Sequence, residues 1–580
     1  MKKRQILSIF ITATYLTTNA FLPVFAAADK SHTVHGGENG SVKGTITEEG
    51  DAGHDTGVEV ISDHEDQGRS SSFEVTGGVE VIDKNAPEAT PAPPAPFYGE
   101  GNTTYGIKNI AVTNTGTLNV KGDITVEYKG NTPDVSAVGI YTEEINGDVN
   151  VNVGKSVSVK SPTGDATGID ANVNQDSTKV IKSDINVKGS VNAETPKGDA
   201  VGIDTANSFG TLNVTVGKDV NVKNTADGKT SYGIHSDMGG GQSNTTIDIG
   251  GSINVNGQPG SAGMVFDIDQ SAAVSSPESN MDVRVKGDVK SSQTGIIVDD
   301  VKNGSVDVVI EGTLSADNGP AVVIDKDATD DFTLTAWRVD APKDYVMENT
   351  GTSESPKLEH TKAAQLVENQ IQYIIKVEPT QAKSITLDNT TIQYFTDANG
   401  NVTKYDTARE GEKIAVKLAI PDGYTLYGVY RDDDQRLPLN VDPNGNYYLI
   451  VPRGGGVIIS MTLVKDVPDP EPVTTPDPEP YDLKDDNPAT QKAGTYYHVD
   501  IYNASKAGMS DAEIQNAYQF AEDYAEINCP DYLTGERRKA FLEYFVMFFR
   551  NMLLNYNGET LDELEQKAAD LAELAVWTMN

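Results

Sequence analysis

Acidic pairs in the middle of the chain are the residues best placed to do chemistry. Asp170 and Asp204 each follow a Gly-Ile pair. Two further pairs are adjacent in the sequence, Asp299-Asp300 and Asp330-Asp331. Two carboxyl groups about 5 to 10 Å apart can hydrolyse a glycosidic bond. Basic residues are sparse beside these acids, and aspartate after Gly-Ile equally suits a turn. We therefore predict no catalytic residue and keep a polysaccharide lyase or glycosidase as the alternative.

Histidines and acidic turns are the candidates for metal binding. Four of the seven histidines lie among acids near the N-terminus: His32, His35, His54 and His64. Zinc needs closely spaced ligands on a framework, and this Gly-rich segment is predicted to be unstructured. The turns at 397–401 and 442–446 have glycine at their fourth position, whereas an EF-hand calcium loop has glycine at its sixth position. We predict no metal and no cofactor.

The chain contains one cysteine, Cys529, so an intramolecular disulfide is excluded. A reactive thiol and an intermolecular crosslink are the functional interpretations. We favour a small buried residue, because free cysteine is among the most often buried residue types.

An internal repeat predicts the element that carries these acids. Its Gly-Ile unit recurs at Tyr105-Gly106-Ile107, Val138-Gly139-Ile140, Thr167-Gly168-Ile169, Val201-Gly202-Ile203, Tyr232-Gly233-Ile234 and Thr294-Gly295-Ile296, with a degenerate copy at Ala262-Gly263-Met264. Successive glycines are 29 to 34 residues apart. A fixed period of this length indicates a stacked-repeat architecture.

Each repeat also contains alternating β-branched runs around a glycine, such as Val149-Asn-Val-Asn-Val-Gly154-Lys-Ser-Val-Ser-Val159. Alternation directs one face inward, and the glycine allows the bend to the next strand. Such short strands bury their apolar faces only by stacking coil on coil. We predict a mainly β chain with a parallel β-helix over residues 98–340. A β-propeller would need longer blades, and a two-sheet sandwich does not predict this period.

The segments around this solenoid set its limits. Residues 29–97 are polar, but fragments at 56–60 and 75–81 resemble the repeat, so first coils are expected there around a Pro-rich insertion at 85–96. After it, 341–375 is predicted to be a connector with a capping helix, because apolar residues recur at helical spacing over 360–372.

Residues 376–465 are predicted to form separate antiparallel strands, with Asn-Gly hairpin turns at 397–401 and 442–446. The stretch Gly411-Glu-Lys-Ile-Ala-Val-Lys-Leu-Ala-Ile-Pro-Asp-Gly-Tyr424 resembles internalin-type bacterial B-repeat modules, as does Tyr447-Tyr-Leu-Ile-Val-Pro452. The family usually has Trp at Tyr430 and Met at Val451. The resemblance implies a small β spacer domain without catalytic residues.

A Pro- and Asp-rich linker at 466–482 precedes a helical unit at 483–580. Capping boxes at 510–513 and 560–563 each open a helix, and 536–555 forms another. The Phe-rich part of that helix, 541–554, contains Glu543 and Arg550 and is shorter than a bilayer span. We therefore predict a three-helix unit, and keep a membrane span and a partner-binding helix as alternatives.

Residues 1–28 read as a signal peptide: three basic residues, an apolar run and Ala26-Ala27-Ala28 before Asp29. An uncleaved anchor is the alternative. The formal charge of -40 disfavours nucleic acid and anionic membrane as partners. We predict an extracellular or cell-surface location, with no transmembrane span after signal cleavage.

Residues 98–340 are similar in pattern to adhesin passengers of the autotransporter and filamentous-haemagglutinin type, and to pectate-lyase-like solenoids. That resemblance implies a non-catalytic, adhesin-like binding protein with a host or environmental glycan or protein as ligand. The C-terminal helices are the expected contact with a cell-envelope partner. No Leu-Pro-x-Thr-Gly sorting signal is visible, so attachment is expected to be non-covalent.

Overall fold

The computed structural model describes residues 32–465 and 517–577, with gaps at 36–37, 51–55, 63–69, 84–102, 113, 132, 145, 174–180, 240–242, 270–278, 303, 326–330, 343, 353–355, 433–435, 519–520, 531–532 and 555–560. The predicted signal peptide, Pro-rich insertion, Pro- and Asp-rich linker and 510–513 capping box lie outside the described residues. The chain divides into two compact units, residues 1–467 and 468–580.

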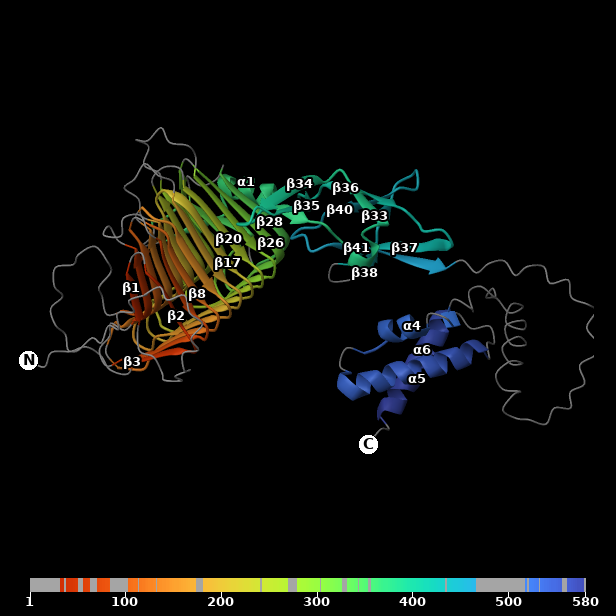
Figure 1. Cartoon of the computed structure of the whole chain (residues 1–580). Helices are drawn as coiled ribbons and strands as arrows, with labels where there is room; N and C mark the ends of the chain where they lie inside the picture. Colours follow the sequence, from red (N-terminus) through yellow and green to blue (C-terminus); the bar gives the residue numbers. More distant parts are fainter. Residues whose placement is uncertain are drawn as a thin grey trace, which may run out of the picture. The chain divides into compact units, whose positions relative to one another are not determined.

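Three columns of parallel strands make up residues 32–349, named here the parallel stack (Figure 1). The chain passes through the first, second and third columns in turn, then returns to the first one strand further along. Neighbours within each column pair in parallel, as in β10–β13, β11–β14 and β12–β15. The chain is thus mainly β with long parallel stacks, an arrangement consistent with a β-solenoid.

The first column contains β1 (His32–His35), β4 (Thr56–Ser62), β7 (Thr103–Ala111), β10 (Ser136–Glu144), β13 (Ala166–Val173), β16 (Ala200–Asn207), β19 (Ser231–Gly239), β22 (Ala262–Asp269), β25 (Thr294–Lys302), β27 (Val322–Asp325) and β29 (Val346–Asn349). The second contains β2 (Asn39–Val42), β5 (Ser71–Val75), β8 (Gly116–Val120), β11 (Val149–Val153), β14 (Lys182–Val187), β17 (Gly210–Val216), β20 (Ser243–Ile249), β23 (Ser279–Val285), β26 (Gly304–Ala316) and β28 (Phe332–Asp340). The third contains β3 (Ile46–Gly50), β6 (Val79–Asp83), β9 (Ile124–Tyr128), β12 (Val157–Lys160), β15 (Val191–Thr195), β18 (Val220–Asn224), β21 (Ile253–Asn256), β24 (Val289–Ser291) and the end of β26.

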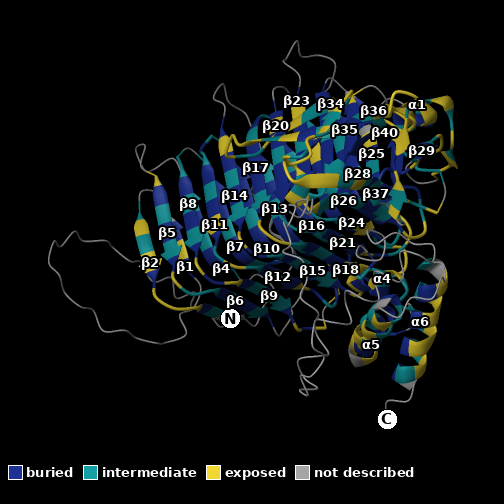
Figure 2. Cartoon of the chain, turned by 90° about the vertical axis from the view of Figure 1, so that its right-hand side faces the viewer, coloured by how far each residue is buried: buried dark blue, intermediate teal, exposed yellow. Residues whose placement is uncertain are grey.

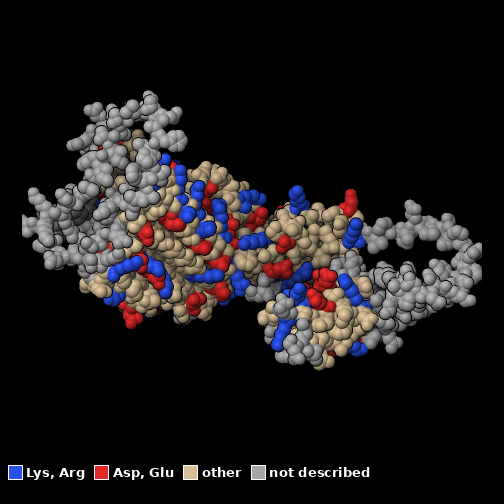
Figure 3. Space-filling view, turned by 60° about the horizontal axis from the view of Figure 1, so that its bottom comes forward, with Lys and Arg blue, Asp and Glu red and all other residues tan. Residues whose placement is uncertain are grey.

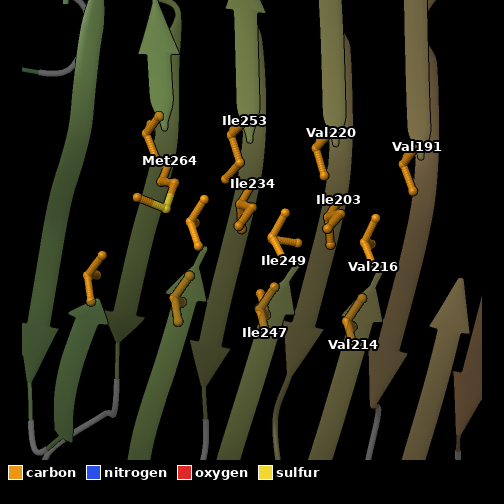
Figure 4. Close-up of a cluster of buried hydrophobic side chains, with 14 of the residues drawn as sticks. Val191, Ile203, Val214, Val216, Val220, Ile234, Ile247, Ile249, Ile253 and Met264 are labelled. Carbon is orange, nitrogen blue, oxygen red and sulfur yellow. The ribbon is translucent and has the colours of Figure 1, made fainter. Parts of the chain in front are cut away.

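Alternation within each strand places one face in a shared core. In β11 the three valines are buried and the two asparagines between them are not. The same buried and less buried alternation runs along the strands in Figure 2. Figure 4 shows inward side chains from all three columns meeting, among them Ile203, Val214 and Val220. The core is therefore one continuous column of mostly aliphatic side chains along the stack, with a few phenylalanines such as Phe73 and Phe266.

The repeated glycine before isoleucine has a packing role in the first column. A Cβ atom at Gly168 would lie 2.5 Å from the carbonyl oxygen of Gly202 and closer still to Cγ1 of Val191. Gly139 and Gly202 meet equivalent atoms in their own neighbours. Glycine recurs here because the third column packs directly against the first-column backbone.

His32 is the first described residue of the stack, which extends N-terminally of residue 98 into the segment where the sequence suggested first coils. The prediction that His32 and His35 are unstructured is wrong, since both lie in β1, which pairs with β4. His32 is buried, with its ring 5.7 Å from that of Phe73. Strand pairing thus places both residues in the stack, and His54 and His64 lie outside the described residues.

At the other end, β28 covers the predicted last strand and β29 adds one more parallel pairing, to β27. Helix α1 (Lys362–Gln370) follows after the short strand β30 (Leu358–Glu359). The hydroxyl of Thr361 caps α1 by accepting from the Ala364 amide, and Ala364 and Val367 are buried in the stack's core cluster. The helix therefore covers apolar side chains at this end of the stack.

Antiparallel pairing dominates between residues 372 and 465. The hairpin β34 (Thr391–Thr396) and β35 (Val402–Ala408) joins β28 through β31 (Gln372–Ile374). One small sheet contains β32 (Lys376–Val377), β41 (Ile458–Lys465), β37 (Tyr424–Asp432) and β38 (Arg436–Pro438); the other contains β33 (Ile385–Asp388), β36 (Lys413–Leu418), β40 (Tyr447–Ile450) and β39 (Asn440–Val441). Both predicted Asn-Gly hairpin turns are confirmed, with Gly400 and Gly445 at positive φ.

The β34–β35 hairpin packs on the outside of the second column. Arg284 of β23 forms a buried ion pair with Asp248 of β20 at 3.0 Å, and its guanidinium lies 4.9 Å from the ring of Phe395 in β34. The hydroxyl of Tyr405 in β35 donates to Glu311 at 2.7 Å. The predicted boundary at residue 376 is therefore crossed by pairing and by side-chain contacts.

The second unit is helical and contains α4 (Ala521–Ile527), α5 (Gly535–Leu554) and α6 (Leu561–Trp577) among its described residues. Phe541, Phe545 and Phe549 are fully buried at four-residue intervals along α5. They pack in one core cluster with residues of α6, such as Leu564 and Ala568. The Phe-rich stripe thus forms the core of its own unit, and Cys529 is partly buried against it.

Among the described residues, no helix is both long enough and apolar enough to cross a bilayer.

Candidate functional site

The residue that follows each Gly-Ile pair forms a row on the outside of the first column. Register pairing aligns five such residues from β7 to β19, named here the polar row: Lys108, Tyr141, Asp170, Asp204 and His235. Neighbouring strands lie about 4.8 Å apart, so the row spans about 19 Å. Half-buried side chains with acidic, basic and aromatic chemistry therefore stand in one line on a regular sheet.

Two carboxyl groups occupy the centre of the polar row. Asp170 and Asp204 are register partners on adjacent strands, β13 and β16. The Asn172 amide donates to Asp170 Oδ1 at 2.6 Å. Burial, followed by the Asp204 charge, raises the pKa of Asp170 to about 7. Asp170 therefore holds its proton into the neutral range.

His235 is the last residue at one end of the polar row and lies next to Asp204. Its Nδ1 lies 2.9 Å from Asp204 Oδ1, and its Nε2 lies 3.7 Å from Asp237 Oδ1. The imidazole stacks on Tyr232 with ring centroids 5.5 Å apart. The hydrogen bond to Asp204 raises the pKa of His235, as do the more distant charges of Asp237 and Asp299. Asp204 thus orients the ring and favours its protonated form.

The opposite end of the row is aromatic. The rings of Tyr105 and Tyr141 meet edge to face at 5.5 Å, and the Lys108 ammonium lies 5.3 and 5.8 Å from their centroids. The Tyr141 hydroxyl donates to Glu143 at 3.1 Å. Burial, then the Glu143 charge, raises the pKa of Tyr141 well above its usual value. A cation held over two rings gives this end a rigid, amphipathic surface.

Replacement of Asp204 by asparagine is expected to lower the pKa of His235, because its main charge-assisted hydrogen bond is lost. An NMR titration of the His235 ring protons measures this directly. Asp237→Asn is the matched control and should lower that pKa less, since its oxygen is 3.7 Å away rather than 2.9 Å. Equal shifts in the two variants would contradict the assigned geometry.

The acids that the sequence singled out have different positions. Asp170 and Asp204 lie side by side, whereas Asp299 lies on β25, where its charge raises the pKa of both His235 and Tyr232. Asp300 is a register partner of Asp267 in the first column. Asp331 precedes β28 in the second column, away from the row, and Asp330 lies outside the described residues.

The other members of the row, Lys108, Tyr141 and His235, were not predicted from the sequence. The signal was present, since each follows the same Gly-Ile pair as the two aspartates. Comparing the residue that follows the Gly-Ile pair in each successive repeat identifies all five members of the row.

No cluster of three or more His, Cys, Asp or Glu side chains suited to a metal ion occurs within the part of the chain that the structure describes.

The fold and the row define a mainly β repeat protein that carries an ordered line of polar and aromatic side chains. No protein-family model matches the chain, and comparison with curated proteins and with solved structures finds no match either.

Proposed function

We propose that the parallel stack is a β-helix and that the chain is an exported, non-catalytic binding protein of the cell surface or extracellular space. The polar row carries this proposal. It presents donors, acceptors and aromatic edges at a constant spacing over five strands, which suits a glycan or protein ligand that lies along the stack. The sheet fixes the spacing of these groups, so little ordering is needed when a ligand binds.

The remaining parts fit a display role. The antiparallel domain resembles bacterial B-repeat spacers and is anchored to the stack by the contacts of Arg284 with Phe395 and Thr403. The helical unit is proposed to contact a cell-envelope partner. Its Phe-rich stripe packs inside that unit, so the contact would use other surfaces of the helices.

Binding through the polar row is tested with an array of immobilised glycans and a parallel set of immobilised extracellular proteins. The double variant Asp170→Asn/Asp204→Asn keeps size and removes both carboxyl groups. It should weaken binding at least tenfold, because the hydrogen bonds that a ligand makes to the two carboxyl groups contribute about 1 kcal/mol or more each. Asp184→Asn is the matched control, since Asp184 accepts a similar hydrogen bond from Asn213 in the second column. Unchanged binding by the double variant would contradict the proposal.

A polysaccharide-cleaving enzyme is the second candidate, favoured by the adjacent register of Asp170 and Asp204. A carboxyl that keeps its proton near pH 7 beside a second carboxyl is the pairing that glycoside hydrolysis uses. Turnover of soluble polysaccharides by the wild type, abolished by each single asparagine variant, would establish this candidate. Binding without turnover leaves the non-catalytic function.

A further inference from the structure

A long groove follows the outside of the third column, away from the polar row. It has a volume of about 690 Å³ and extends from Ser158 in β12 to Asp317 beyond β26. A second hollow of about 630 Å³ adjoins it over the turns that follow β9, β12, β15 and β18. Lys160, Glu194 and Lys223 line both. The groove crosses six successive turns of the chain, or about 24 Å at the usual strand spacing.

A ladder of side-chain amides forms one row of the groove. Asn254 donates to Asn221 at 2.9 Å, Asn221 donates to Asn192 at 2.9 Å, and Asn192 donates to Ser158 at 3.2 Å. Each amide carries two N–H groups and an oxygen with two lone pairs. Asn192 also donates to the Val157 carbonyl oxygen at 3.4 Å, whereas Asn221 and Asn254 each use one N–H in the ladder, so further donors and acceptors remain for a ligand. The amides occupy register positions on three successive strands, β15, β18 and β21.

An ion-pair row runs beside the amides. Glu194 lies 3.0 Å from Lys223 and 3.5 Å from Lys160, and its hydrogen bond to Lys223 lowers its pKa. Lys290 in turn lies 3.0 Å from Asp288. Figure 3 shows basic and acidic side chains interspersed over the visible face of the stack. Each lysine of the groove thus has an acidic partner, with Lys160 and Lys223 sharing Glu194, whereas the whole chain has a formal charge of -40.

This charge balance selects the kind of ligand. A polyanion would find the groove's lysines already paired and would be repelled by the net charge of the chain. A polycation would meet lysines along the groove. A neutral, hydroxyl-rich polymer is repelled neither by the net charge of the chain nor by the lysines. Its hydroxyl groups can donate hydrogen bonds to, and accept them from, the amides and the charged side chains of the groove.

We infer that this groove binds a neutral linear polysaccharide, aligned along the stack with its hydroxyl groups on the Asn192–Asn221–Asn254 ladder. The site is separate from the polar row and does not depend on it. Because the protein chemistry repeats from strand to strand, affinity should increase with the number of sugar units until the groove is filled.

The test is titration calorimetry of the full chain with cellohexaose, maltohexaose and mannohexaose, and with hexagalacturonate as an acidic probe of the same length. At least one neutral hexasaccharide should bind, and hexagalacturonate should bind at least tenfold more weakly. Asn221→Val should weaken that binding about tenfold by removing the middle of the ladder. Asn152→Val is the matched control, because Asn152 donates to Asn119 in the same way in the second column, outside the groove.

Each outcome decides the inference. Failure of all three neutral probes overturns it, as does tighter binding of hexagalacturonate. Equal losses in the Asn221 and Asn152 variants also overturn it, because the effect would then come from the fold. Thermal unfolding of each variant shows whether the stack is intact. The Asp170→Asn/Asp204→Asn variant should bind the hexasaccharide normally, so failure of the polar-row proposal and failure of the groove can be told apart.

Discussion

Replacement of Gly168 by valine is expected to destabilise the parallel stack by about 3 kcal/mol or more. The new Cβ would lie 2.5 Å from the Gly202 carbonyl oxygen and still closer to Val191. Neither neighbour can withdraw freely, since one is backbone and the other fills the core. A lower thermal midpoint, with faster amide exchange in β13 and β16, would report the loss.

Thr167→Val on the same strand is the control. Thr167 faces outward and is only partly buried, so a side chain of the same shape should change the midpoint little. If the Gly168 variant unfolds at the same temperature as this control, the close approach between the first and third columns is wrong.

Replacement of Glu144 by glutamine is expected to stabilise the stack at pH 9, by at most about 4 to 5 kcal/mol. Glu144 is fully buried at the end of β10, and neither carboxyl oxygen has a well-formed hydrogen bond. Burial raises its pKa to about 8 from an ordinary value of 4.5, although the nearby hydroxyls of Ser183 and Thr142 lower it somewhat.

The direction in which the free energy of unfolding changes with pH follows from the number of protons that the folded and unfolded chains bind. The unfolded chain loses this proton near pH 4.5, whereas the folded chain keeps it until about pH 8. The wild-type free energy of unfolding therefore falls as pH rises through that window, and the full cost is present above pH 8. Glutamine removes the titration, so the two proteins should converge near pH 4 and diverge towards pH 9.

Thermal midpoints at pH 4, 6 and 9 test this difference. Glu127→Gln removes an equivalent charge from an outward-facing position that pairs with Lys129 at 3.0 Å. Its midpoints should follow those of the wild type at every pH. A Glu144 variant that does the same would show that Glu144 is not buried in the core.

The repeat was predictable because its physical cause is local. Alternating valines and a glycine at each bend recur with little change, so Val149–Val153 alone indicates which side chains are buried. The Asn-Gly turns at 397–401 and 442–446 were predictable for the same reason, since a positive φ favours glycine at one defined position.

Contacts between distant residues were not predictable in this way. Arg284 meets Phe395 and Thr403 across more than 100 residues, and no local pattern marks that contact. His32 and His35 were predicted to be unstructured because no repeat was recognised at residues 32–35. Their strand is defined by its pairing with β4, which lies more than 20 residues further along the chain. For the candidate site, Asp170 and Asp204 could be selected by chemistry, but their direct pairing depends on the register of β13 and β16.

The central claim, that the chain is displayed outside the cell by its helical unit, is tested most directly by protease treatment of intact producing cells. Full-length chain and a chain ending at residue 480 are compared in the medium, at the cell surface and in the cytosol. We predict that external protease degrades the full-length chain on the cells and that the shortened chain is released into the medium. Full-length chain that remains in the cytosol, protected from protease, would contradict the account.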